Sequence, residues 1–178
     1  MMQEFVDQIR KTIKSQIRTI HTDLPGKIVS FDTKTCLATV LPVMTYKQPN
    51  GKTVPYPQIP DVPVLFPQSA GQDAVIAYPI KAGDGCLILV AEKSIDYWLK
   101  GHETETDLAF DLTNAICIPG LFAEANETVK EACSSNAVII KMKNTTLAVK
   151  KNGVEIDADK VTINGDLDVN GRVSARNI

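Results

Sequence analysis

The first hydrophobic pattern in the chain has the period of a helix. Apolar residues recur at intervals of four, four, four and three, at Phe5, Ile9, Ile13, Ile17 and Ile20. This spacing predicts an amphipathic helix over residues 3–20, within an N-terminal segment 1–22 that Pro25 and Gly26 are expected to end. The apolar stripe either docks on the chain's own domain or contacts a neighbouring subunit or assembly partner. We expect Phe5, Ile9, Ile13 and Ile17 to bind a partner.

Residues 23–123 show short apolar runs separated by turn residues instead. Six runs have the length of strands, at residues 27–31, 36–43, 62–66, 73–79, 86–91 and 115–118. Because proline cannot donate to a sheet ladder, the crowded prolines are expected in loops, sheet edges and strand ends, at Pro42, Pro49, Pro55, Pro57, Pro60, Pro63 and Pro67. Gly83, Asp84 and Gly85 predict a hairpin turn between residues 78–80 and 87–90. So many short strands favour a small closed or partly open barrel such as an OB-fold.

The most regular pattern lies in residues 138–178. Pairs of apolar residues with one residue between them recur every six or seven residues, at Val138/Ile140, Leu147/Val149, Val154/Ile156, Val161/Ile163 and Leu167/Val169, followed by Val173. Each pair has the period-2 alternation of a strand with one apolar face. Asn-Gly dipeptides at residues 152–153, 164–165 and 170–171 suit sharp turns. The polar residues 124–137 before this segment are interpreted as a connector with a short helix.

These repeats bury too little surface to fold alone. Each one buries about two side chains and leaves both strand edges unpaired, so about 35 such residues cannot form a core. Three copies wound together would bring three apolar faces to one axis and pair every edge with another chain. We therefore predict a homotrimer whose residues 138–178 form an intertwined triple-stranded β-helix. Its axis core would consist of Val154, Ile156, Val161, Ile163, Leu167, Val169 and Val173. The alternative is a β-meander folded back on the barrel.

Composition supports a folded, mainly β chain and narrows its function. Hydrophobic residues make up 44% of the 178 residues, so disorder is not expected. The formal net charge of -2 lacks the basic footprint of a general nucleic-acid-binding protein. No apolar run approaches the roughly 18 residues of a membrane span. Charged residues such as Glu4 and Asp7 interrupt the N-terminus before a secretory signal could form. We expect synthesis and folding in a cytoplasm.

Cysteine spacing argues against a metal or redox motif. Cys36, Cys86, Cys117 and Cys133 form no C-x-x-C pair, and we expect small buried thiols in a reducing compartment.

Other residues that could support catalysis are scattered. His21 and His102 are the two histidines, and a solvated position explains both better than a catalytic base. The alternating carboxylates of residues 103–107 have no apolar pocket to separate their pKa values, which favours a solvated face over a glycosidase pair. Trp98 is expected to pack in the core or an interface rather than to stack on a base or sugar. We therefore predict no enzymatic activity, no cofactor and no metal site.

Four stretches resemble the central-spike family of contractile phage tails. They are IPDVPVLFP at residues 59–67, YPIKAGDGCLILV at 78–90, SIDYWL at 94–99 and NAICIPGL at 114–121. The resemblance covers roughly residues 24–122 and depends on the order and spacing of the stretches. It implies an OB-fold domain that trimerises beneath the tail tube, followed by a trimeric β-helix that narrows to a point. The barrel would then be a structural collar, and hub or tail tube proteins would be its partners.

The end of the chain departs from the family pattern. Many members end in a His-x-His apex that binds iron between three chains, whereas no histidine follows His102 here. Iron binding is therefore not implied. The blunt, polar end, with Arg176, Asn177 and Ile178, instead suits a separate tip protein.

The predicted function is that of a baseplate spike subunit in the virion, which pierces the host envelope mechanically when the sheath contracts. The alternative is an OB-fold nucleic-acid-binding protein with an oligomerisation tail. A basic, aromatic-lined groove would favour that alternative, but aromatic residues make up only 6% of the chain.

Overall fold

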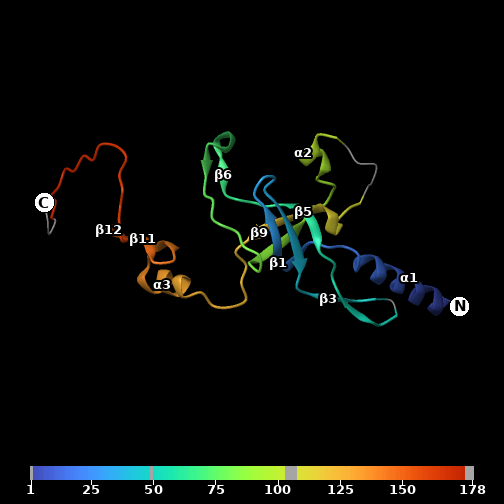
Figure 1. Ribbon diagram of the computed structural model, residues 1–178. Helices are drawn as coiled ribbons and strands as arrows, with labels where there is room; N and C mark the ends of the chain where they lie inside the picture. The colour runs from blue at the N-terminus through green and yellow to red at the C-terminus, as the bar shows by residue number, and fades with distance from the viewer. Residues whose placement is uncertain (1, 49, 103–107, 175–178) are drawn as a thin grey trace. The chain divides into compact units, whose positions relative to one another are not determined.

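The computed structural model describes residues 2–48, 50–102 and 108–174 (Figure 1). The chain divides into two units, Met1–Ala123 and Glu124–Ile178. The first unit contains the N-terminal helix and a curled sheet, and the second contains a short helix and a small sheet. Pro49, the carboxylates Glu103, Glu105 and Asp107, and the terminal residues 175–178 lie outside the described residues, so the expectations for them stay predictions.

Helix α1 (Met2–Ile17) confirms the predicted N-terminal helix, although it ends three residues early. The chain leaves the helix in a tight turn, where the amides of Thr19 and Ile20 donate to the carbonyls of Gln16 and Ile17. The expectation that Pro25 and Gly26 end this segment is wrong, since both lie inside strand β1 (Asp23–Asp32). A side chain at Gly26 would have little room, because a Cβ would lie 2.5 Å from Cδ1 of the buried Ile88 side chain.

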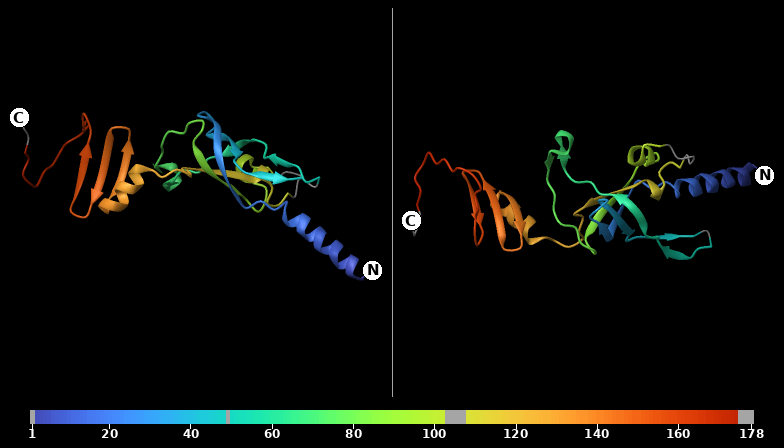
Figure 2. Two further views of the ribbon diagram at one scale, coloured as in Figure 1. Left: turned by 90° about the horizontal axis from the view of Figure 1, so that it is seen from below. Right: turned by 45° about the horizontal axis from the view of Figure 1, so that its top comes forward.

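The first unit is built on a five-stranded antiparallel sheet. Its strand order is β5-β2-β1-β8-β9, with β2 at Leu37–Pro42, β5 at Ile59–Pro63, β8 at Gly85–Val90 and β9 at Ala115–Pro119. The two edges approach each other after β5, where Val64 bridges Cys117 in parallel and the Leu65 amide donates to the Cys117 carbonyl at 2.8 Å. The sheet is therefore a curled half-barrel (Figure 2), which is consistent with an OB-like fold.

The concave side of this sheet holds the core. Alternate residues of β1 and β2 are buried, as the period-2 pattern requires. The buried cluster consists of Leu24, Ile28, Ala38, Val40, Ile59, Val62, Cys86, Ile88, Ala115 and Cys117, with Phe31, Val64, Ile80 and Leu112 packed against it. Asn114 is buried beside the cluster, and its side-chain amide donates to the Leu108 carbonyl at 3.0 Å. Cys86 and Cys117 match the expectation of buried thiols, whereas Cys36 and Cys133 are exposed.

The structure confirms some of the predicted strands and contradicts others. Strands β1, β2, β8 and β9 confirm the runs at residues 27–31, 36–43, 86–91 and 115–118, and β5 starts three residues before the predicted run at 62–66. The long strand predicted at residues 73–79 is wrong, since only β7 (Ala74–Val75) forms and pairs with β6 (Gln68–Ser69) across the single turn η1 (Ala70–Gln72).

The predicted hairpin around Gly83, Asp84 and Gly85 is also wrong. Residues 76–84 contain no strand. The turn itself exists, because the Asp84 carboxylate accepts from the Lys81 amide at 2.7 Å and Gly83 has a positive φ of 95°. However, the Gly83 amide donates to the Ile28 carbonyl and the Ile28 amide donates to the Asp84 carbonyl. The turn is therefore held against β1 rather than joining two strands.

The proline-rich stretch contains a hairpin that the sequence reading missed. Strands β3 (Thr45–Lys47) and β4 (Thr53–Pro55) pair antiparallel, and the Gln48 amide donates to the Lys52 carbonyl at 2.9 Å next to them. The described prolines between Pro42 and Pro67 lie in loops, at strand ends or in the edge strand β5, as expected, whereas Pro25 lies inside the central strand β1. Between β8 and β9 the chain forms the short helix α2 (Asp96–Lys100) and the turn η2 (Leu112–Asn114).

The second unit starts with the short helix expected in the connector. Helix α3 (Glu127–Ser135) is capped by Asn126, whose side-chain oxygen accepts from the amides of Thr128 and Val129. Asn136 ends it in the left-handed conformation. Strands β10 (Val138–Met142), β11 (Thr145–Lys150) and β12 (Gly153–Asp157) then form an antiparallel sheet in that order.

The single chain does not contain the expected intertwined β-helix. Residues 138–157 pair with one another as a β-meander. This agrees with the alternative in its strand pairing, and its packing on the barrel stays a prediction. The described residues 158–174 contain no strand, so the pairs Val161/Ile163 and Leu167/Val169 are not in the predicted strands. A strand needs a hydrogen-bonded neighbour, and this segment has none within the described chain.

Candidate assembly surfaces

One face of the β10–β12 sheet is apolar and bare. Two rows of directly opposed residues cross the three strands, Val138–Val149–Val154 and Ile140–Leu147–Ile156. Opposed residues in an antiparallel sheet share a face, and Met142 extends this face along β10. We call these seven residues the apolar sheet face. Leu147 is half-buried, and the exposed fractions of the other six side chains lie between 44% and 66%.

The opposite face of the same sheet is mostly polar, and part of it is covered by helix α3. Helix α3 packs against β10, and Ala148 is buried on β11. Lys150 and Glu155 form an ion pair at 2.6 Å across β11 and β12. The groove between α3 and β10 is open and includes Lys141 among its lining residues. The chain thus covers its more polar face and leaves the apolar one exposed, which is the reverse of an ordinary soluble sheet.

The predicted axis residues fall into two groups. Val154 and Ile156 lie together on the apolar sheet face. Val161, Ile163, Leu167, Val169 and Val173 follow beyond the last strand, and each is at least 44% exposed. Single exposed apolar residues are ordinary, but a contiguous apolar patch marks an interaction surface. The seven residues of the apolar sheet face form such a patch, which makes this face a candidate assembly surface.

Helix α1 carries a second exposed apolar surface. None of its residues is buried by the chain, and Figure 2 shows it as a rod with no strand along its side. The predicted partner-binding residues Phe5, Ile9, Ile13 and Ile17 are all exposed, and Met2 and Val6 join them.

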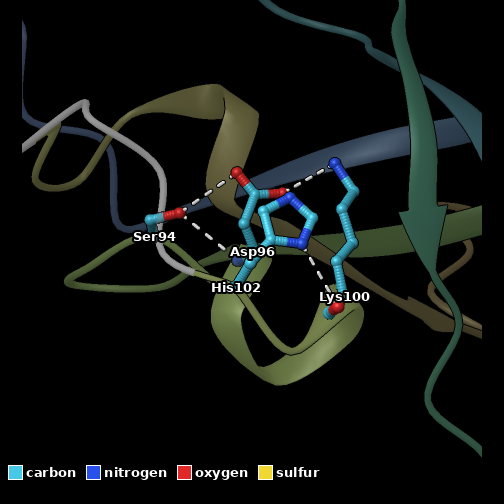
Figure 3. Close-up of polar contacts among 4 residues, drawn as sticks. All are labelled: Ser94, Asp96, Lys100 and His102. Atoms are coloured by element: carbon cyan, nitrogen blue, oxygen red, sulfur yellow. Dashed lines mark hydrogen bonds and ion pairs between the residues drawn. The ribbon is translucent and has the colours of Figure 1, made fainter.

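The connection between β8 and β9 holds a local polar network (Figure 3). Lys100 Nζ lies 2.9 Å from Asp96 Oδ1, and this contact holds the pKa of Asp96 below its usual value. The Ser94 hydroxyl donates to Asp96 Oδ2 and accepts from the Asp96 amide, both at 3.3 Å. His102 Nδ1 contacts the Lys100 carbonyl at 3.2 Å. These contacts fix the start and end of α2, and they join His102 to main chain rather than to a nucleophile.

His21, Tyr46 and Tyr56 form a small aromatic cluster. His21 packs edge-on against Tyr56 with ring centroids 5.7 Å apart, and Tyr56 contacts Tyr46 at 4.9 Å. His21 is half-buried here instead of solvated. Trp98 on α2 is 74% exposed, so it does not pack in the core. The other expectation, that it packs in an interface, stays a prediction.

Within residues 2–48, 50–102 and 108–174, no group of three or more His, Cys, Asp or Glu side chains is placed to hold a metal ion. In the same described residues, no helix combines the length and apolar character that crossing a membrane requires.

The comparison with known proteins found a family match over the curled sheet of the first unit. Residues 24–120, from β1 to β9, match the family model described as phage protein Gp138 N-terminal domain. A search of curated proteins found no match.

Proposed function

The chain belongs to the family of the phage protein Gp138 N-terminal domain, and on this premise we propose that it is the central-spike subunit of a contractile injection machine. Family membership makes it a phage structural protein with a tail-related, virion-associated role. The proposal adds a mechanism to that role. Sheath contraction drives the tail tube forward, and a rigid spike at its front, placed in the baseplate, breaches the host envelope.

The apolar sheet face is the observation that carries this proposal. A spike must be stiff, and a homotrimer becomes stiff when three apolar faces close on one axis. Burial stabilises by roughly 25 cal/mol per Å² of apolar surface, so a face of seven apolar residues per chain favours association strongly. Val161, Ile163, Leu167, Val169 and Val173 would continue the axis column beyond the sheet.

The two ends of such a trimer would contact different partners. The first unit, with α1 and the half-barrel, would meet the hub or tail tube proteins of the baseplate. The C-terminal end would carry a separate tip protein. In this mechanism the subunit acts by force alone, without catalysis, a cofactor, a metal ion or nucleic acid.

The mass of the full chain in solution tests the trimer. Size-exclusion chromatography with light scattering should give three times the chain mass of 19.4 kDa at micromolar concentration. A monomer under these conditions would contradict the proposed function, because the apolar sheet face would then need no second copy.

Localisation tests the spike role separately from the trimer. Antibodies raised against the purified chain should label intact virions at the distal end of the tail under the electron microscope. Label on the head or along the tail sheath would show a structural phage protein with a different position.

A further inference from the structure

The exposed apolar residues of α1 fit the simple helical spacing, and they also fit a heptad repeat. Met2, Val6, Ile9 and Ile13 follow one another at intervals of four, three and four, and Gln16 continues the series after three more residues. Alternating intervals of four and three average 3.5 residues, which is the period of a coiled-coil seam. In heptad notation Val6 and Ile13 occupy a positions, whereas Met2, Ile9 and Gln16 occupy d positions. Phe5 and Ile17 flank this seam.

The charged residues of α1 lie outside the a and d positions of this heptad repeat. Four charged residues of the helix, Glu4, Asp7, Lys11 and Lys14, occupy the b and f positions on the side opposite the seam. Arg10 is the remaining one, at an e position, where its guanidinium lies 4.0 Å from the Asp7 carboxylate. No like charges therefore face each other across the seam when copies of α1 lie side by side in parallel.

The chain itself provides no cover for this seam. Ile9 and Ile13 are 42% and 53% exposed, and no residue of α1 is buried. A helix of 16 residues is marginal in water without packing partners. The helix therefore gains most of its stability from whatever covers the seam.

We propose that the α1 helices of three copies of this chain pack in parallel as a short coiled coil. The side chains favour this occupant, because β-branched Val6 and Ile13 at a with Ile9 at d favour three or four strands over two, and the proposed homotrimer supplies three. Gln16 at the last d position adds one polar layer at the C-terminal end of the seam. The inference deepens the proposed homotrimer and rests on it, since tethering in a trimer raises the effective concentration of the three helices. The stripe predicted to bind a partner would then be buried by the other two copies, with the charged outer side left for the baseplate.

Disulfide cross-linking of the full chain tests this arrangement. The exposed thiols are first removed by Cys36→Ser and Cys133→Ser, which leaves Cys86 and Cys117 buried in the core. Ile13→Cys then places a thiol in the seam, and Lys14→Cys is the matched control one residue away on the outer side. After mild oxidation, Ile13→Cys should give disulfide-linked dimers on a non-reducing gel, and Lys14→Cys should give none. If Ile13→Cys does not fold, Ile9→Cys at the neighbouring d position replaces it.

Two results would overturn the inference in distinguishable ways. If the cross-linking variants keep the trimer mass but Ile13→Cys and Lys14→Cys link equally or not at all, the coiled coil is wrong and the trimer stands. The stripe would then be left for another protein of the baseplate. If the parent chain has the mass of a monomer, both the coiled coil and the proposed homotrimer are wrong.

Discussion

Gly85 has the least room of any glycine in the first sheet. A Cβ at this position would lie 1.9 Å from the Leu121 carbonyl oxygen, which is main chain and cannot rotate away. The Gly85 carbonyl also accepts from the Gly120 amide at 2.9 Å, so the two segments are tied at this point. The close approach joins the start of β8 to the segment that follows β9.

We therefore expect Gly85→Ala to destabilise the first unit. Overpacking of this kind costs about 1–3 kcal/mol of unfolding free energy, and urea denaturation followed by circular dichroism would measure it. Gly153→Ala is the control, because a Cβ there meets nothing within 4 Å. Equal stability of the two variants would show that the Leu121 main chain shifts freely.

Cys86 and Cys117 should resist alkylation in the native protein. Both side chains are fully buried. The pKa of the Cys117 thiol is raised above its usual value, mainly by the hydrogen bond with Cys86 and also by burial. A raised pKa keeps this thiol protonated at pH 8, whereas the thiolate is the reactive form. Iodoacetamide followed by peptide mass spectrometry should therefore modify Cys36 and spare Cys86 and Cys117 until the chain is unfolded. Native modification of Cys117 would place it outside the core.

At the scale of elements, sequence patterns predicted strands that bury one face. In β1, β2, β8 and β9 a period-2 or continuous apolar run coincides with a buried face, and each was found near its true position. Hairpin β3–β4 was missed because its residues are only three per strand and largely exposed. The available signal was Asn50-Gly51 between Thr45-Tyr46-Lys47 and Thr53-Val54-Pro55, which the neighbouring prolines obscured.

The candidate surfaces were predictable in part for the same reason. Apolar spacing identified the α1 stripe and the pairs that form the apolar sheet face, because periodicity reports which residues share a side. Periodicity alone does not predict which element or partner covers that side. Periodicity therefore predicts strands at Val161 and Leu167, for which the described residues supply no partner strand.

An aspartate on the apolar sheet face should break up the assembly. Ile156 lies opposite Leu147 and is 56% exposed in the single chain. Ile156→Asp would place a charge against apolar neighbours in every copy, with no counter-ion to offset the loss of hydration. Light scattering should show a lower mass than that of the parent chain, with the far-ultraviolet dichroism of the sheet retained.

Lys151→Asp is the matched control for this experiment. It introduces the same residue in the exposed turn between β11 and β12, away from the apolar rows. A parent-like mass for both variants would show that the apolar sheet face is not the contact between copies.

At the scale of the whole molecule, exposed apolar surface is found in both units. The first unit closes a core of its own within the half-barrel and still exposes α1. The second unit buries Ala148 alone among its described apolar residues. A small sheet and one helix with so little core cannot account for their own stability. In the proposed homotrimer, assembly would supply most of the stability of residues 124–178, whereas the first unit has a core of its own.

The axis column beyond the sheet gives the sharpest test of the complete spike. Val161 is 55% exposed and has no strand partner in the single chain. In the proposed trimer three copies of it converge, so Val161→Asp would gather three like charges in an apolar interior, at several kcal/mol of desolvation per charge. We expect a lower melting temperature and dissociation of the trimer on dilution. Lys160→Asp adds the same aspartate one residue earlier, which an extended chain turns to the opposite side, and should melt like the parent. If Val161→Asp also melts like the parent and stays trimeric, Val161 does not face the axis and the column ends with the sheet.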